Sequence, residues 1–211
     1  MSNRGKSESA TAQSNRRRIA AIIAVAIVLY LGLSVASARL CAHVLRFKCY
    51  YLTAGAMAPT LQKNDRVIVD KMAYVRQPPR REEIIVFQPP HIQIEKTIIK
   101  RVVAVGGDQL LIEDGQLYVK NMETPVAEPY ILEPMWYRFP QDGEPYAVPV
   151  GHVFVLGDNR NNSLDSHRFG SVPEDNIIGR VVAIYYPPGR MRTFYPDDSG
   201  AGDGSLTVDT G

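Results

Sequence analysis

Short apolar runs separated by turn residues limit the fold of this chain more than any other feature of its sequence. They extend from about Tyr50 to Tyr195, and several alternate apolar with polar side chains, as strands with one buried face do. The strand-like runs are 66–69, 83–87, 98–105, 110–112, 116–119, 152–156 and 181–186. We therefore expect a mainly β domain over 50–195, with antiparallel sheets packed or coiled into a barrel-like core.

Glycine, proline, asparagine and aspartate mark the turns between these runs. Asp114-Gly115 lies directly between two of them, which predicts a tight β-hairpin. The segment 121–150 differs, because it contains six prolines, Trp136 and several tyrosines. We interpret it as an irregular insertion that lies on the core, not as a second domain.

The N-terminal region has the pattern of a membrane anchor. Residues 1–18 are polar and end in three arginines, which predicts a disordered tail, whereas 19–38 is a run of twenty residues without a charge. As a helix, a run of that length matches a hydrocarbon core of about 30 Å. The preceding arginines favour a cytoplasmic N-terminus, with the remaining chain in the periplasm or the thylakoid lumen. We expect one transmembrane helix over 19–38, extending to about residue 47.

A second interpretation of the same region is a cleaved secretory signal. The arginines would form its basic region, and Ala36-Ser37-Ala38 would be its small-residue cleavage site. In both interpretations the bulk of the chain is exported. The last stretch, 196–211, is rich in glycine and aspartate and predicts another disordered tail.

Composition excludes several classes of partner. A formal charge of +2, without clusters of basic and aromatic residues, does not favour nucleic acid. The chain has neither a His/Cys cluster with metal-ligand spacing nor a phosphate-binding loop. We therefore expect no metal and no nucleotide cofactor.

Three sequence blocks carry the functional prediction. They read AGAMAPTL at 54–61, KRVVAVGGD at 100–108 and GDNRNNSLDS at 157–166. In this order behind an apolar segment, they resemble the type I signal peptidases, a family of membrane-anchored serine proteases with a Ser/Lys dyad. The resemblance covers about 50–188, and the last block is most similar to cyanobacterial and plastid members.

Peptide hydrolysis needs a nucleophile, a base and donors for the developing oxyanion. A lysine can be the base only when it is neutral, and an apolar setting favours that form. Lys100 lies within an apolar run, where it either extends its amine to solvent at a sheet edge or has a function. The resemblance implies the following roles: Lys100 is the general base, Ser163 orients it, Asp165 organises the site through ion pairing, and Asp158, Asn159 and Arg160 brace the loop. The family places arginine two residues after the aspartate, whereas this chain has His167 and then Arg168.

The first block departs from the family at two positions. Ala56 stands where the family has its nucleophilic serine, and Ala54 stands where a serine hydroxyl would join the oxyanion hole. Loss of the nucleophile costs on the order of a millionfold in turnover, and loss of one oxyanion donor costs on the order of a hundredfold or more. Thr53 and Thr60 are the nearest hydroxyls, but neither should project where residue 56 does.

Several hypotheses are open at this point. The paired alanines reflect either natural divergence or deliberate replacement to make an inactive trap. The first functional hypothesis is a signal peptidase I-like protein at a lipid membrane, of the kind that removes signal peptides from exported precursors, which with Ala54 and Ala56 lacks ordinary Ser/Lys proteolysis. The alternative is a non-catalytic pseudoprotease that binds precursors or regulates an active signal peptidase. A third hypothesis is an anchored β domain without a functional groove.

Overall fold

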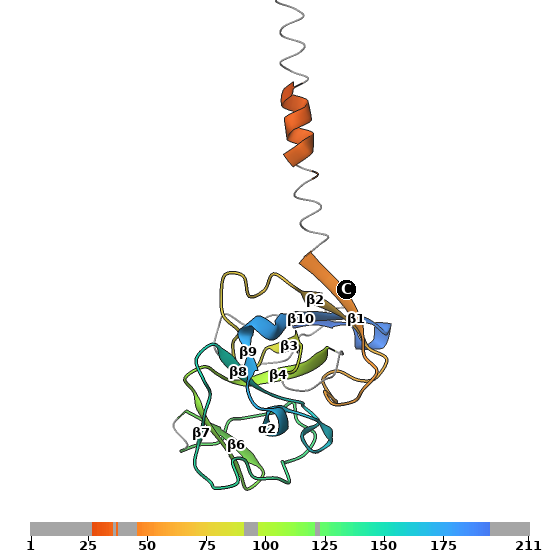
Figure 1. Cartoon of the computed structure of the whole chain (residues 1–211). Coiled ribbons are helices and arrows are strands. Elements are labelled where there is room, and N and C mark those ends of the chain that lie inside the picture. The colour runs from red at the N-terminus through yellow and green to blue at the C-terminus, as the bar shows by residue number, and fades with distance from the viewer. Residues whose placement is uncertain (1–26, 36, 38–45, 91–96, 121–122, 195–211) are drawn as a thin grey trace, which may run out of the picture. The chain divides into compact units, whose positions relative to one another are not determined.

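The computed structural model of the chain describes residues 27–35, 37, 46–90, 97–120 and 123–194. Residues 27–35 are helical (Figure 1). Within the described part of the chain, no helix combines the length and the apolar character needed to cross a membrane. Half of the predicted anchor at 19–38 and both predicted tails lie outside the described residues. Arg46 is helical and the strand β1 begins at Phe47, so the expected extension of the helix to about residue 47 stays a prediction over 38–45, which lie outside the described residues.

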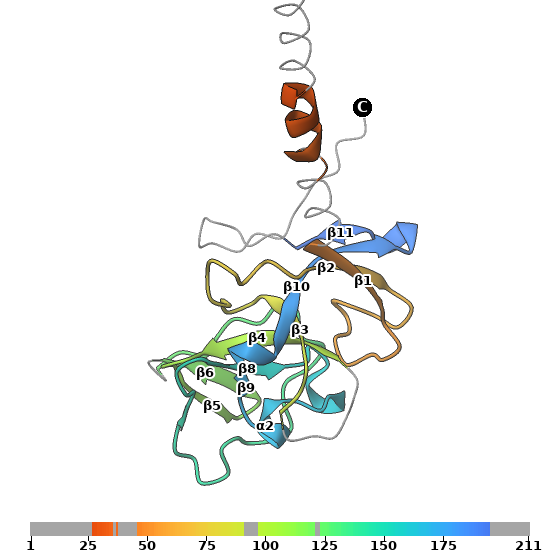
Figure 2. The same cartoon turned by 45° about the horizontal axis from the view of Figure 1, so that its top comes forward.

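Most of the described strands form one antiparallel sheet that curls into a half-barrel (Figures 1 and 2). In order across the sheet, they are β1 (Phe47–Tyr51), β2 (Arg66–Asp70), β10 (Ile177–Tyr186), β3 (Ile84–Phe87), β4 (Ile98–Val105), β8 (His152–Leu156) and β9 (Val172–Pro173), with β11 (Arg192–Thr193) paired to β10. The expectation of a mainly β, antiparallel core is thus confirmed. Register shifts along β10 against both of its neighbours introduce bulges, and bulges increase the twist of a strand.

A smaller antiparallel sheet contains the predicted hairpin. Its order is β6 (Gln116–Val119), β5 (Gln109–Glu113) and β7 (Tyr146–Ala147). Asp114 and Gly115 both have positive φ, of 50° and 78°, as the two central residues of a type I′ turn require. The segment 121–150 is less irregular than expected, because β7 pairs with β5 and Phe139 forms a bridge to Ile112.

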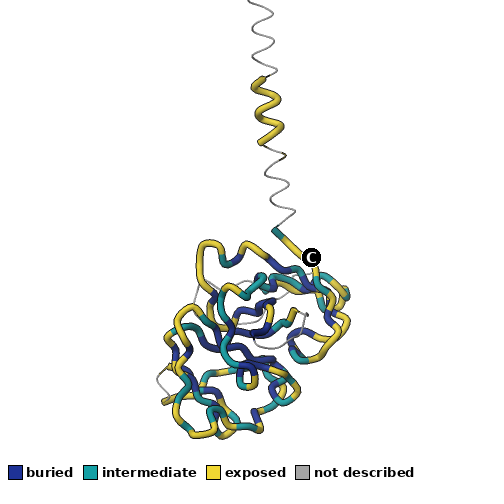
Figure 3. Tube along the Cα trace, viewed as in Figure 1, coloured by how far each residue is buried: buried dark blue, intermediate teal, exposed yellow. Residues whose placement is uncertain are grey.

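The strand β3 is buried on both faces, which explains its uninterrupted apolar sequence. Ile84 and Val86 pack into one core cluster with β2 and β10, whereas Ile85 and Phe87 pack into another with β8. Successive side chains of a strand point to opposite faces, so each cluster receives two of the four residues of β3. Figure 3 shows in dark blue that buried segments lie in the interior of the β domain.

A third core cluster lies between β4, β8 and the small sheet. Phe154 on β8 is fully buried and contacts two aromatic rings of the 121–150 segment. Its ring centroid lies 5.3 Å from that of Phe139 and 5.5 Å from that of Tyr146. These tilted aromatic contacts attach the segment to the main sheet.

Short helical turns connect the later strands. They are η1 (Arg160–Asn162), α2 (Ser166–Phe169), η2 (Glu174–Asn176) and η3 (Pro188–Arg190). The loop that leaves β8 therefore contains η1 and leads directly into α2. Asp165 occupies the N-cap position of α2, but its carboxylate makes no capping hydrogen bond there. That carboxylate is used elsewhere in the fold.

The aromatic cluster gives the first testable prediction. Phe154→Ala should lower the free energy of unfolding by about 3–5 kcal/mol, because it leaves a cavity beneath the small sheet. Chemical denaturation measures the change. Trp136→Ala, at a side chain that is 78% exposed, should stay within about 0.5 kcal/mol of the unaltered chain. Equal losses in the two variants would contradict this packing role.

Candidate active site

The turn that carries residue 56 is held from beneath by apolar anchors. Met57 and Leu61 are buried in the same core cluster as β2, and the Leu61 amide donates to the Met57 carbonyl over 2.8 Å. The Ala58 amide donates to the Gly55 carbonyl over 3.1 Å. Ala56 is half-buried at the surface of this turn. Its backbone position is therefore defined by its neighbours and not by its own side chain.

Two arginines near the end of the described chain hold the other side of this turn. Arg190 donates to both carboxylate oxygens of Asp65 at 2.9 Å, and Arg192 donates to the Thr60 carbonyl at 2.6 Å. Burial alone would raise the pKa of Asp65, but the hydrogen bonds and charge of Arg190 outweigh it and hold that pKa below its ordinary value.

Lys100 lies at the centre of the candidate site. It is on β4, it is only 2% exposed, and so it does not extend to solvent at a sheet edge. Its Nζ donates to Ser163 Oγ and lies 2.9 Å from Asp165 Oδ1. Ser163 Oγ in turn donates to the same carboxylate oxygen over 2.5 Å. The three side chains form a closed triangle of amine, hydroxyl and carboxylate.

The second oxygen of Asp165 accepts a hydrogen bond from the Gly157 amide over 2.9 Å. The Asp165 side chain is completely buried, and both of its oxygens are paired. The partner that its sequence context left open is therefore Lys100, together with Ser163 and the loop backbone. His167, at the position where the family has arginine, instead stacks on Tyr137 with 4.2 Å between ring centroids.

The loop after β8 brings this triangle to residue 56. The Asn159 amide donates to the Ala56 carbonyl over 3.1 Å, and the Asn159 side-chain amide donates to the Gly55 carbonyl over 3.3 Å. A Cβ on Gly157 would overlap both Ser163 Oγ and the Ala56 carbonyl oxygen. Only glycine permits this approach, which packs the residue-56 backbone against the lysine network. Ala54 lies on the same turn and is exposed.

Asp158 and Arg160, two further charged residues of the loop, pair with residues outside the triangle. Asp158 accepts two hydrogen bonds from Arg101, at 2.8 Å and 2.7 Å. Arg160 is buried, donates to the Gly157 carbonyl over 3.0 Å and pairs with Glu128. Asp158, Asn159 and Arg160 thus each connect the loop to another segment of the domain, and the bracing role that the resemblance implies for them stays a prediction.

Sequence reasoning missed several of these partners. In the sequence, Arg101 is one residue of the KRVVAVGGD block, and no motif contains Glu128, Arg190 or Arg192. Glu128 lies in the Pro-rich segment, where no periodic pattern indicates which side chains point inward. Arg190 is 125 residues from Asp65, and only the fold brings the two together.

The assembled site holds a buried lysine, a serine hydroxyl and a carboxylate close to the backbone of Ala56. A family model described as signal peptidase, peptidase S26, matches residues 16–186. The chain therefore belongs to the signal peptidase family S26, and its similarity to cyanobacterial and plastid type I members is confirmed by the relatives.

Three relatives show this similarity. Thylakoidal processing peptidase 1 of Arabidopsis thaliana chloroplasts is 42% identical over 158 residues, which are 70% of this chain and 45% of the relative. Probable signal peptidase I-1 of Synechocystis sp. is 40% identical over 66% of this chain and 71% of its own length. Signal peptidase I of Leptolyngbya laminosa is 38% identical over 84% and 83%, respectively. The chain thus spans less than half the length of the Arabidopsis protein.

His167 gives a second prediction, on pH dependence. Burial lowers its pKa below the ordinary value of 6.5; the positive charges of Arg168 and Lys100 add to this effect, and Asp165 opposes it. Between the folded pKa and 6.5 the unfolded chain binds more protons, so the folded state loses stability as pH falls through that window.

His167→Gln should therefore make stability fall less steeply between about pH 7 and pH 5. Denaturant titrations at several pH values measure the slope for each protein. A comparison at pH 8, where the imidazole is neutral in both folded and unfolded states, separates any general packing effect of the substitution. An equal or steeper slope in the variant would contradict the assignment.

Proposed function

We propose that this chain is a signal-peptidase-like membrane protein that receives the signal peptides of exported precursors and, with Ala54 and Ala56, does not cleave them by Ser/Lys chemistry. The observation that carries the proposal is the closed triangle of Lys100, Ser163 and Asp165, which is packed against a residue whose side chain is a methyl group. The uncharged run at 19–38 supports an anchor with a cytoplasmic N-terminus and the β domain on the exported side.

The chemistry follows from the positions of these groups. With serine at residue 56, neutral Lys100 would take the hydroxyl proton as Oγ attacks the scissile carbonyl, and the residue-56 amide would donate to the oxyanion. The lysine would later return that proton to the leaving amine. With alanine there is no Oγ to form the acyl bond. Thr60 does not replace it, because its buried hydroxyl accepts a 3.4 Å hydrogen bond from Arg101.

The substrate would be an extended peptide with small side chains at the cleavage site, bound by strand addition along a sheet edge. A second candidate function is a pseudoprotease that regulates an active signal peptidase in the same membrane. Its support is that Lys100 and Asp165 satisfy each other without any side chain from residue 56. If the protein has this second function, the triangle of Lys100, Ser163 and Asp165 stabilises the fold and no longer supplies a general base.

Restoration of the hydroxyls tests the proposal. The unaltered chain in detergent micelles should give no correctly processed product from an exported precursor. Ala54→Ser/Ala56→Ser should process it at least about a thousandfold faster than the unaltered chain, since a nucleophile is worth on the order of a millionfold. The cleavage site is identified by mass spectrometry of the products.

The matched control adds Lys100→Met to the double serine variant and should abolish the recovered activity. Correct processing by the unaltered chain would overturn the proposed inactivity. A folded double serine variant that cleaves nothing would overturn the catalytic assignment of the triangle and favour the regulatory candidate. Co-purification with an active signal peptidase then distinguishes regulation from precursor binding.

A further inference from the structure

The tripeptide Glu128-Pro129-Tyr130, in the Pro-rich segment, contacts both arginines that flank the lysine network. Glu128 accepts hydrogen bonds from Arg160 at 2.7 Å and 2.5 Å, one to each carboxylate oxygen. The two side chains are 4% and 0% exposed, so this is a buried, bidentate ion pair. A buried guanidinium that loses its anion keeps its desolvation cost without compensation. The position of Arg160 therefore depends on Glu128.

Arg160 connects this ion pair to the candidate site through the loop backbone. Its Nε donates to the Gly157 carbonyl over 3.0 Å, and the Gly157 amide donates to Asp165 Oδ2 over 2.9 Å. The other oxygen of Asp165 is the one that pairs with Lys100. A continuous series of buried polar contacts thus leads from Glu128 to the lysine amine, and it passes through the glycine that has no space for a side chain.

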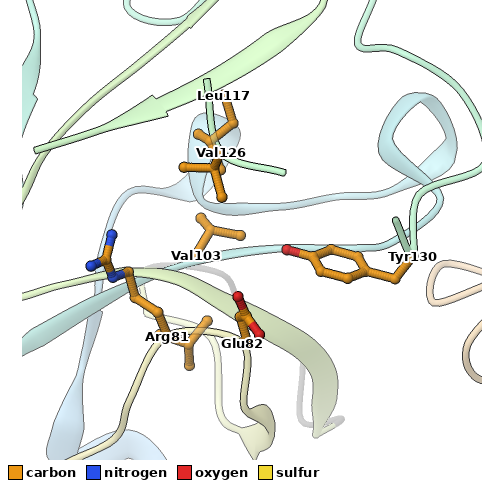
Figure 4. Close-up of a pocket in the computed structure, with 7 residues that line it drawn as sticks. Arg81, Glu82, Val103, Leu117, Val126 and Tyr130 are labelled. Atoms are coloured by element: carbon orange, nitrogen blue, oxygen red, sulfur yellow. The ribbon is translucent and has the colours of Figure 1, made fainter. Parts of the chain in front are cut away.

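Tyr130 is the residue of the tripeptide that contacts Arg101, on the strand β4. The Arg101 guanidinium lies 3.9 Å from the centroid of the Tyr130 ring, and the Tyr130 hydroxyl donates to Glu128 over 3.2 Å. Figure 4 shows the Tyr130 side chain extending across a small pocket whose lining includes Glu82 and Val103. Arg101 directly follows Lys100 on β4, so the tripeptide contacts both sides of the network.

We propose that Glu128 is a positioning residue for the lysine network, acting through Arg160 and Gly157 to hold the carboxylate that pairs with Lys100. The role of that network in peptide hydrolysis rests on the function proposed above. Glu128 itself does not touch the reacting atoms. Its effect is to keep Gly157 and Asp165 at hydrogen-bonding distance, and so to fix where the amine stands beside residue 56.

Glu133 provides a matched control within the same segment. Its carboxylate also accepts a hydrogen bond from the loop, from Asn161 Nδ2 at 3.1 Å. The other hydrogen bonds of the Asn161 amide return to the segment, at the Pro134 carbonyl and the Trp136 amide. Glu133 therefore attaches the segment to the loop through Asn161, whose side-chain hydrogen bonds lead back to the segment and not to Gly157.

The first experiment does not depend on activity. Amide hydrogen exchange at Gly157 is measured by NMR in the full, unaltered chain and in two single variants. Glu128→Gln should exchange about tenfold faster or more at Gly157, whereas Glu133→Gln should stay within about twofold. The Val86 amide in β3 reports global stability, so the increase at Gly157 in Glu128→Gln should exceed any increase at Val86 in the same variant. Equal exchange at Gly157 in the two variants would overturn the proposal.

If Glu128→Gln does not fold, Glu128→Asp is measured in its place. Aspartate keeps the negative charge, but its side chain is one methylene shorter. The Gly157 amide should therefore exchange faster than in the unaltered chain, by less than about tenfold. Exchange identical to that of the unaltered chain would count against the proposal. Loss of folding in both variants would also overturn it, because Glu128 would then stabilise the whole domain and not one loop.

The second experiment uses the Ala54→Ser/Ala56→Ser background. Addition of Glu128→Gln should lower kcat about tenfold or more with KM within about threefold, and should move the pH–rate profile, because a base that is out of place affects the transition state and not substrate binding. Addition of Glu133→Gln should leave both parameters within about twofold. A change in KM alone would overturn the positioning role. If the background itself is inactive, the proposed function fails, and Gly157 exchange still decides the role of Glu128.

Discussion

The buried ion pair between Lys100 and Asp165 is the constraint on which the rest of the site depends. Their side chains are 3% and 0% exposed, and two ions removed from water in this way need close pairing and further hydrogen bonds. Ser163 and the Gly157 amide supply those bonds, so the loop after β8 must lie directly on β4. That close approach requires glycine at 157 and places the loop backbone beside residue 56.

The charged side chains around Lys100 and Asp165 form separate ion pairs. Arg101 is matched by Asp158 and Arg160 by Glu128, in addition to the lysine and its aspartate. Each buried cation therefore has its own carboxylate, and none of these pairs uses a side chain from residue 56. This explains how the arrangement is complete with alanine there: residue 56 is adjacent to the polar network but contributes no side chain to it, so the fold does not depend on the side chain at this position.

Patterns that are local in the sequence predicted most of the strands and the hairpin. Asp114-Gly115 has the backbone chemistry of one turn type, and the apolar run of β3 is long enough to be recognised. Strands of two residues, such as β7 and β9, are too short to show an alternation of apolar and polar side chains. They form because neighbouring strands provide hydrogen-bonding partners. The resemblance of the three sequence blocks to type I signal peptidases pointed to the three residues of the triangle. Their convergence, and the roles of Glu128 and Arg190, depend on contacts between distant segments that no local pattern encodes.

The contacts of Arg190 and Arg192 with the residue-56 turn have a consequence for the order in which the molecule matures. The turn is synthesised early in the β domain, yet its neighbour Asp65 is held by Arg190 from η3, and its carbonyl at Thr60 is held by Arg192 from β11. A nascent chain that has not yet produced these arginines has the loop sequence but not its final geometry. The geometry of the residue-56 turn is therefore completed only after the chain has been synthesised through Arg192, more than 130 residues beyond the turn itself.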